Sequence, residues 1–347
     1  MLQSHHRLAI LLHHGTVGAK GKTGLALLRY SENPIVAVID EACPGGDVPA
    51  LTGIDRPVPI VGSMAAALDL KPDVLAIGLA PSGGSLPAPW YAEVRQAVAA
   101  GVSVMNGLHM TMSADPDMVN QLQPNQWIWD MRQEPAGLTV GSGQARTLDC
   151  RRVLAVGTDM AVGKMSTCIE LHRATRRRGL PSKLVATGQT ALMLGADGIP
   201  LDAVRIDFAS GAVEQAVMRN APGQDVIYVE GQGSIFNPAS TATLPLLRGT
   251  QPTHLVLVHK LGMDQLQFLP DFQLPSLSQV VQIYETLAAA GGTFAAVKVA
   301  GVALNTFGVD DAVARDAIAA VSQATGLPCT DVVRFGAEPI LSAILAN

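Results

Sequence analysis

Short apolar runs alternate along the chain with longer segments in which apolar residues recur at helical spacing. In the first half these patterns predict strands at residues 8–12, 35–39, 74–78 and 102–105, and helices at 90–100 and 115–122. In the second half they predict strands at 153–156, 183–187, 226–229, 255–258 and 297–304, and helices at 163–178, 278–290, 311–325 and from 337 onward. Strands and helices that alternate in this way are typical of parallel α/β sheets.

A segment rich in proline, glycine and serine, EPAGLTVGSGQ at 134–144, separates the two halves. A chain of 347 residues is also longer than one typical hydrophobic core. We therefore predict two α/β domains, at residues 1–140 and 141–347.

Composition and charge narrow the class of protein. Hydrophobic residues make up 48% of the chain and charged residues 15%, as in a globular enzyme, and the net charge of −5 disfavours nucleic acid and anionic membranes as partners. No apolar run is long enough to span a bilayer, and the run at 8–12 is too short for a signal peptide. The four cysteines lie far apart without a C-x-x-C pair, which favours reduced thiols. We expect a cytoplasmic protein.

The stretch VLAVGTDMAVGKMST, at 153–167, carries the most functional information. An apolar run leads into a loop with Gly157, Thr158, Asp159, Val162, Gly163 and Lys164, and a helical pattern follows. Glycines let backbone N–H groups approach an anion, a helix N-terminus adds partial positive charge, and a lysine reaches the terminal phosphates. The sequence predicts a site for a phosphate-bearing ligand here.

One position departs from the common phosphate-loop motif. That motif places a magnesium-binding Ser or Thr directly after the lysine, but this chain has Met165 there, followed by Ser166 and Thr167. The missing hydroxyl disfavours ordinary hydrolysis of a magnesium nucleotide.

A second glycine loop, from Gly15 to Thr23, has the same glycine-to-lysine spacing and carries the Thr that the first loop lacks. Asp40 ends the next predicted strand, but no acidic strand end with a glycine turn follows it. Nucleotide binding, an anion or interdomain role, and a purely structural turn all remain open for this loop. The segment 78–87, GLAPSGGSLP, follows a strand and could line a cleft.

Three further strand ends follow the Gly157 loop in order. Lys183 opens the strand-like stretch KLVATGQT, Glu230 ends an apolar strand before a Gly-x-Gly turn, and Asn305 ends the stretch GVALN. In this order they resemble dethiobiotin synthetase, whose pattern runs GTDxxVGKT, KPVxTG, EGxGG and then a strand-ending Asn beside the adenine. The resemblance covers residues 153–305, with Met165 as its main departure.

A resemblance over nearly the whole chain is carried by GKTGLALLRY, APSGGSLP, GTDMAVGKMST, ATGQT, DFASGAVE, EGQGS, PSL…IYE and GVALNT. Together these motifs are similar to the two-domain family, long catalogued as a domain of unknown function, that is typified by D-glutamate N-acetyltransferase. The resemblance implies a Rossmann-like N-terminal domain and a P-loop domain, in which a Met after the lysine is usual. It also implies acetyl transfer from acetyl-CoA to the amino group of a D-amino acid.

One segment departs from the pattern expected of that family. After EGQGS we would expect a His and a Tyr where this chain has Asn237 and Ser240. Because these positions are expected beside the active site, the departure bears on which amine is the acceptor more than on the class of reaction.

We assign roles accordingly. Glu230 is predicted as general base or metal-linked orienter, Lys183 as partner of the oxyanion or of a carboxylate, and Asp207 as reserve acid. The loop residues named above, with Met165, Ser166 and Asn305, are predicted to hold the coenzyme. The alternative is an ATP-dependent ligase or kinase of the dethiobiotin-synthetase type, with Asp207 and Glu230 holding Mg²⁺ for Mg-ATP. A P-loop regulator or metallochaperone is a third class.

Other features carry less chemistry. The adjacent pairs His5–His6 and His13–His14 cannot both face one metal from a strand, where side chains alternate, so we predict no metal site there. No Gly-x-Ser-x-Gly elbow is present, which disfavours an acyl-enzyme. We expect a small-molecule amino-acid substrate and a homo-oligomer.

Overall fold

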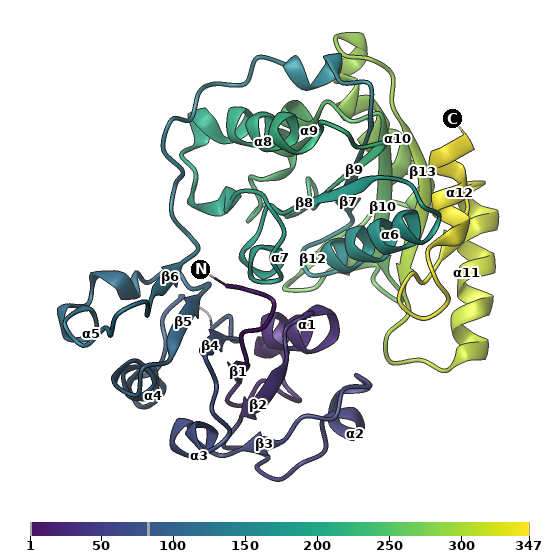
Figure 1. Ribbon diagram of the computed structural model, residues 1–347. Helices are drawn as coiled ribbons and strands as arrows, with labels where there is room; N and C mark the ends of the chain where they lie inside the picture. The colour runs from purple at the N-terminus through teal and green to yellow at the C-terminus, as the bar shows by residue number, and fades with distance from the viewer. Residues whose placement is uncertain (1, 82–83, 347) are drawn as a thin grey trace. The chain divides into compact units, whose positions relative to one another are not determined.

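The computed structural model describes residues 2–81 and 84–346 (Figure 1). The chain forms two compact units. The N-terminal unit contains Met1–Gln133 and the short segment Gln189–Gly195, and the C-terminal unit contains Glu134–Gly188 and Ala196–Asn347. Both units are built on parallel sheets, so the predicted α/β fold class is confirmed.

The N-terminal unit is a six-stranded parallel sheet in the order β3-β2-β1-β4-β5-β6. This order reverses between β1 and β4, which is the doubly wound Rossmann arrangement. The strands are β1 (Leu8–Leu11), β2 (Ile35–Ile39), β3 (Ile60–Val61), β4 (Val74–Ile77), β5 (Ser103–Asn106) and β6 (Ile128–Asp130). Its helices are α1 (Lys22–Tyr30), α2 (Val48–Thr52), α3 (Met64–Leu68), α4 (Ala88–Ala99), α5 (Pro116–Val119) and α7 (Gln189–Met193).

Helix α7 belongs to this unit although its sequence lies far from the rest of it. The hydroxyl oxygen of Thr190 lies 3.0 Å from that of Thr23 at the start of α1. A Cβ atom on Gly107, just after β5, would meet the side chains of Gln189 and Met193 at 2.9 Å. The absence of a side chain at Gly107 therefore makes room for α7 beside β5.

The second glycine loop connects β1 to α1. The Asp40 carboxylate, at the end of β2, accepts the N–H groups of His14 at 2.8 Å and Thr16 at 3.1 Å. A Cβ atom on Gly21 would overlap the carbonyl oxygen of Gly15. The Asp40 carboxylate thus satisfies two N–H groups of this loop, and backbone packing explains the glycine at 21. Of the three roles left open for the loop, these contacts favour a purely structural turn. Of the segment 78–87, residues 82 and 83 lie outside the described residues.

The C-terminal unit has six parallel strands in the order β14-β13-β10-β7-β9-β8. They are β7 (Arg151–Gly157), β8 (Ser182–Val185), β9 (Val226–Val229), β10 (His254–Lys260), β13 (Lys298–Asn305) and β14 (Cys329–Thr330). The helices are α6 (Lys164–Arg177), α8 (Ile206–Asn220), α9 (Thr243–Thr250), α10 (Leu277–Ala288), α11 (Asp311–Thr325) and α12 (Glu338–Ala346). Helices α6 and α12 pack together on one face of the sheet (Figure 1).

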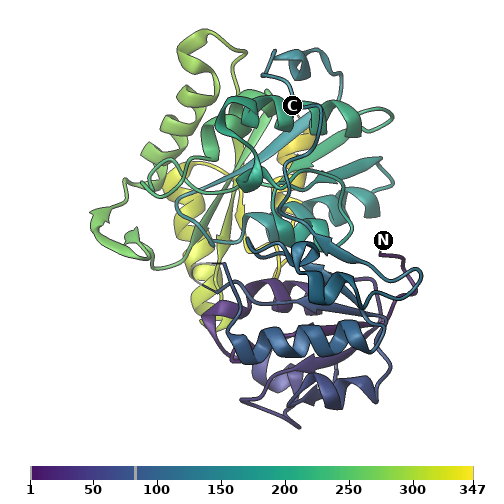
Figure 2. The ribbon, with the colours of Figure 1, turned by 90° about the vertical axis from the view of Figure 1, so that its left-hand side faces the viewer.

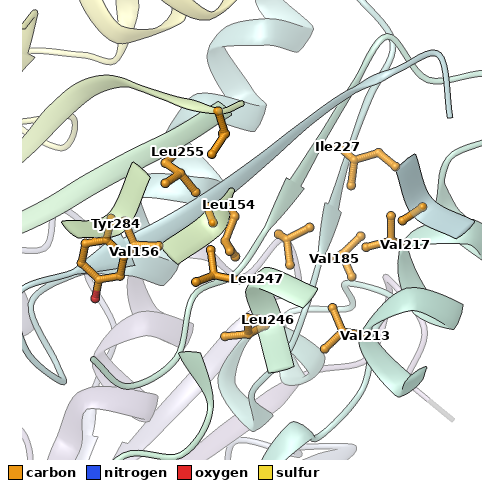
Figure 3. Packing of buried hydrophobic residues seen from close by; sticks show 14 of the residues in the cluster. Leu154, Val156, Val185, Val213, Val217, Ile227, Leu246, Leu247, Leu255 and Tyr284 are labelled. Carbon is orange, nitrogen blue, oxygen red and sulfur yellow. The ribbon is translucent and has the colours of Figure 1, made fainter. Parts of the chain in front are cut away.

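The main core lies on the other face of this sheet, where α8, α9 and α10 pack. Leu154 and Val156 of β7 lie with Leu246 and Leu247 of α9 and Tyr284 of α10 (Figure 3). All five are buried. Burial of each such side chain contributes about 1.5–3 kcal/mol, so β7 is held firmly where the Gly157 loop leaves it.

The linker is part of the C-terminal unit. The Glu214 carboxylate, inside α8, accepts the Ser142 N–H at 3.1 Å and the Gln144 N–H at 3.2 Å. A Cβ atom on Gly211, one helical turn earlier, would overlap the carbonyl oxygen of Thr139. The motif DFASGAVE is thereby explained in part as an attachment of the linker to α8.

A two-stranded hairpin follows β10, made of β11 (Gln265–Leu266) and β12 (Leu269–Gln273). Figure 2 shows it standing out from the side of the C-terminal unit. In the part of the chain that the structure describes, no helix is long and apolar enough to cross a membrane.

Candidate functional site

The Gly157 loop connects β7, a central strand, to α6. Gly163 precedes α6 with φ 118°, and Ala161 has φ 57°. Both values lie in the left-handed region, which glycine tolerates and other residues adopt at a cost. The loop therefore turns sharply, as a phosphate-binding loop does.

Hydroxyl groups from two distant segments hold the first carbonyl groups of the loop. The Tyr284 hydroxyl donates to the Gly157 carbonyl oxygen at 2.7 Å, and burial raises the pKa of this tyrosine, so it stays a donor. The Ser234 hydroxyl donates to the Thr158 carbonyl oxygen at 2.9 Å.

Two nitrogen donors hold the next carbonyl groups. The Lys164 Nζ donates to the Asp159 carbonyl oxygen at 2.8 Å, and Asn305 Nδ2 donates to the Val162 carbonyl oxygen at 3.1 Å. Four carbonyl groups of the loop are thus satisfied by the protein itself. A loop whose carbonyl oxygens are bonded in this way presents its N–H groups to an anion.

The first turn of α6 supplies further N–H groups. Lys164, Met165 and Ser166 open this helix, where N–H groups have no intrahelical acceptor. The partial positive charge of the helix N-terminus adds to that of Lys164. The predicted role of this loop in holding a phosphate-bearing ligand stays a prediction.

The stem of Lys164 lies against two glycines. A Cβ atom on Gly157 would meet Lys164 Nζ at 3.0 Å, and one on Gly231 would meet Lys164 Cδ at 2.9 Å. Larger residues at either position would push the lysine off its path along the loop. At Gly231 the added Cβ atom would also overlap the carbonyl oxygen of Ala155 in β7, so the close approach of this backbone requires a glycine after Glu230.

The buried Asp159 carboxylate serves the loop itself. It accepts the Asn237 Nδ2 amide at 2.7 Å, the Met160 N–H at 2.6 Å and the Gln267 N–H at 2.9 Å. These donors satisfy a charge that would be costly to bury alone. Asp159 thereby joins the loop to the segment after β9 and to the hairpin.

Glu230 follows β9 and is buried. Its carboxylate accepts the N–H groups of Thr187 at 3.0 Å and Gly188 at 3.1 Å, and the Thr187 hydroxyl donates to the Glu230 carbonyl oxygen at 2.8 Å. Glu230 therefore holds the turn after β8. Its predicted role as base stays a prediction.

The structure does not bring Lys183 to the loop. Lys183 pairs with Ile227, which pairs with Arg152, five residues before the loop begins. The lysine is exposed and lies toward the amino ends of the strands, away from the carboxyl edge where ligands bind. Asp207 is exposed in the first turn of α8, and no side-chain contact joins it to the loop among the described residues.

Comparison with known proteins identifies the family. The model of the DUF1611 P-loop domain, a domain of unknown function, matches residues 139–341, and that of the DUF1611 Rossmann-like N-terminal domain matches residues 41–134. The chain belongs to the DUF1611 family. It is also similar to a crystal structure of a DUF1611 family protein from Anabaena variabilis ATCC 29413, with 57% identity, a TM-score of 0.96, and coverage of 99% of this chain and 100% of that one.

Two curated relatives to which this chain is similar carry the name D-glutamate N-acetyltransferase. The one from a Pseudoalteromonas species is 32% identical over 81% of this chain and 83% of its own length. The one from Tritonibacter scottomollicae is 34% identical over 78% of this chain and 81% of its own length. The family resemblance predicted from the motifs is therefore confirmed.

The two residues that depart from the expected family pattern, Asn237 and Ser240, both lie in the segment after β9 and contact the Gly157 loop or a residue that holds it. Asn237 donates to Asp159, as described above, and is buried. The Ser240 hydroxyl accepts the Ser234 N–H at 3.1 Å. In this DUF1611 protein both side chains support the loop from the segment after β9.

The hydroxyl groups after Met165 are placed differently from that of the common motif. The Thr167 hydroxyl donates to the Gly163 carbonyl oxygen at 3.1 Å, inside its own helix. Ser166 lies one position further along α6 than the usual magnesium ligand. The loop thus keeps its anion-binding parts while the usual position of the metal ligand carries a thioether.

Several residues of the site were not predicted from the sequence. Ser234 and Tyr284 hold the loop, and His259, at the end of β10, lies with Nδ1 3.0 Å from the Thr158 hydroxyl oxygen. Ser234 and Tyr284 lie in two of the family motifs, EGQGS and IYE, and this position in the motifs could have marked them as site residues. His259 comes directly after the apolar run at 255–258, as Glu230 comes after the one at 226–229.

Proposed function

We propose that this protein transfers an acetyl group from acetyl-CoA to the amino group of a D-glutamate-like amino acid. The names of two relatives, each more than 30% identical over most of the chain, support this proposal. The resemblance of the motifs to the same family supports it from the sequence.

The observation that carries the proposal is the bonded loop with Met165 after its lysine. Coenzyme A bears a pyrophosphate and a 3′-phosphate, which need an anion site but no hydrolysis. Four loop carbonyl groups are bonded within the protein, and Lys164 with the first turn of α6 supplies the positive charge. These parts suit phosphate binding, and the hydroxyl that nucleotide hydrolysis would use is absent from its usual position.

The chemistry requires a base and a stabilised oxyanion. The acceptor amino group is protonated at neutral pH and must lose a proton before it attacks the thioester carbonyl. The oxygen of that carbonyl then gains negative charge, which backbone N–H groups at a fixed site stabilise without reorganisation. The Glu230 carboxylate holds the neighbouring turn at Thr187 and Gly188 in place.

A thermal-shift comparison of acetyl-CoA with Mg-ATP tests the proposal. A ligand that binds only the folded state raises the apparent stability by mass action. We expect acetyl-CoA to raise the melting temperature and Mg-ATP to raise it less. A clear shift with Mg-ATP and none with acetyl-CoA would favour the ATP-dependent ligase or kinase instead.

The acceptor is tested separately, with acetyl-CoA and a panel of D- and L-amino acids. We expect transfer to D-glutamate or a close relative of it. Transfer to another amine alone would keep the reaction class and change the substrate.

A further inference from the structure

Among the described residues, one imidazole lies at the carboxyl edge of the C-terminal sheet, that of His259. Strand β10 lies beside β7 with Val258 level with Gly157, so His259 comes next to Thr158. Its Nδ1 lies 3.0 Å from the Thr158 hydroxyl oxygen. Of the three histidines in this unit, His254 lies at the amino end of the same strand and His172 lies within α6, bonded to Ser182.

The carboxylates near the loop are already engaged. Asp159 accepts three hydrogen bonds, and Glu230 accepts two backbone N–H groups. The oxygens of both carboxylates are therefore committed to holding the Gly157 loop and the turn after β8. A base for the proposed acetyl transfer is better supplied by a group with an uncommitted nitrogen.

His259 meets this requirement. Among the described residues its Nε2 has no hydrogen-bond partner. Burial lowers the pKa of the imidazole, and the Asp264 carboxylate opposes this by a smaller effect. The residues beside it on the neighbouring strands, Thr158 and Leu304, do not titrate. The imidazole is therefore neutral at pH 7, which is the form that accepts a proton.

We propose that His259 is the base that removes a proton from the ammonium group of the acceptor amino acid. This inference rests on the proposed acetyl transfer. The ammonium nitrogen gives one proton to Nε2 of His259. The Thr158 hydroxyl oxygen meanwhile accepts a hydrogen bond from the N–H group at Nδ1. The neutral amine then forms a bond to the acetyl carbon, the carbon–sulfur bond breaks, and the sulfur takes the second proton from nitrogen. The imidazolium releases its proton to water.

The test compares two matched variants, His259→Asn and His254→Asn. Asparagine keeps a polar group near Nδ1 and removes Nε2. His254 is a suitable control because its Nδ1 lies 2.9 Å from the hydroxyl oxygen of Thr253, a contact like that of His259. For both variants and the parent, acetyl-CoA affinity is measured by calorimetry, and turnover is measured as a function of pH.

We expect His259→Asn to bind acetyl-CoA within about threefold of the parent and to lose roughly a hundred- to ten-thousand-fold in turnover at pH 7. Its remaining rate should rise with pH, because the free amine then forms without a base. Added imidazole should restore part of the turnover of a His259→Gly variant. His254→Asn should retain turnover.

Three results would overturn the inference. Turnover of His259→Asn within about fivefold of the parent would show that no base has been lost. An equal loss of coenzyme affinity and turnover would make His259 a structural support of Thr158. Absence of transfer by the parent protein would overturn the proposed function and this inference together, so the parent is assayed first.

Discussion

Asn237 donates its side-chain amide to the buried carboxylate of Asp159 at 2.7 Å. This bond joins the segment after β9 to the phosphate loop at the point where the chain departs from the expected family pattern. A histidine there could also donate an N–H group to the carboxylate. The departure at Asn237 therefore preserves a donor to Asp159.

We predict that Asn237→Ala lowers the unfolding free energy by about 1–3 kcal/mol, because one donor to a buried carboxylate is lost. Asn237→Asp should cost more, since it places a second negative charge against Asp159. Asn237→His should lie nearest the parent. Urea denaturation of the three variants gives this order, and an Asp variant as stable as the parent would refute it.

The Glu230 carboxylate could act as a base or support the turn after β8, and two substitutions distinguish these roles. Gln at 230 keeps an oxygen for the N–H groups of Thr187 and Gly188, whereas Ala removes it. We predict that Glu230→Gln folds normally with turnover within about tenfold of the parent, and that Glu230→Ala loses about 1–3 kcal/mol of stability. A loss of turnover in Glu230→Gln of roughly a hundredfold or more, with normal folding, would instead make Glu230 the base.

Lys164 provides a direct test of the anion site. We predict that Lys164→Ala weakens acetyl-CoA binding at least tenfold, because it removes the fixed positive charge at the loop. Lys183→Ala is the comparison, since this lysine is exposed and lies near the other end of the strands. Isothermal titration of both variants decides the matter. If the Lys164 variant and the parent bound acetyl-CoA with equal affinity, the phosphate groups would have to bind at another place in the protein.

Gly211 gives a prediction whose sign is informative. By helix propensity alone, Ala in α8 would stabilise the protein by about 1 kcal/mol. The Cβ atom would overlap the Thr139 carbonyl oxygen, so we predict a loss of about 1–3 kcal/mol instead. Gly62→Ala is the control, because its Cβ would meet only Pro44, at 3.6 Å. The melting temperatures of the variants are compared by thermal unfolding. A higher melting temperature for Gly211→Ala than for the parent would contradict the attachment of the linker to α8.

The sequence predicted the strands of both sheets that carry continuous apolar runs, because burial on two faces leaves a clear pattern. Helix α8 was not predicted, since Gly211 and small residues weaken its periodicity, and Pro245 interrupts the pattern of α9. The short strands β3 and β14 contain two residues each and give too little pattern to detect.

The candidate site could be predicted in part. The Gly157 loop is local in sequence, so its residues and spacing were visible. Tyr284 and Asn305 reach the loop from segments more than a hundred residues away, and local pattern does not show which side chains meet. Lys183 was misplaced because the pattern showed a strand but not its register. The register puts this lysine level with Arg152, through Ile227.

The most direct measurement of the central claim uses isotope-labelled acetyl-CoA with D-glutamate, with and without Mg-ATP, and follows the products by mass spectrometry. The account predicts a labelled N-acetyl amino acid and an equal amount of free coenzyme A thiol, formed without ATP and lost in the Lys164→Ala variant. ADP formed only in the presence of the amino acid, with no acetylated product, would contradict it.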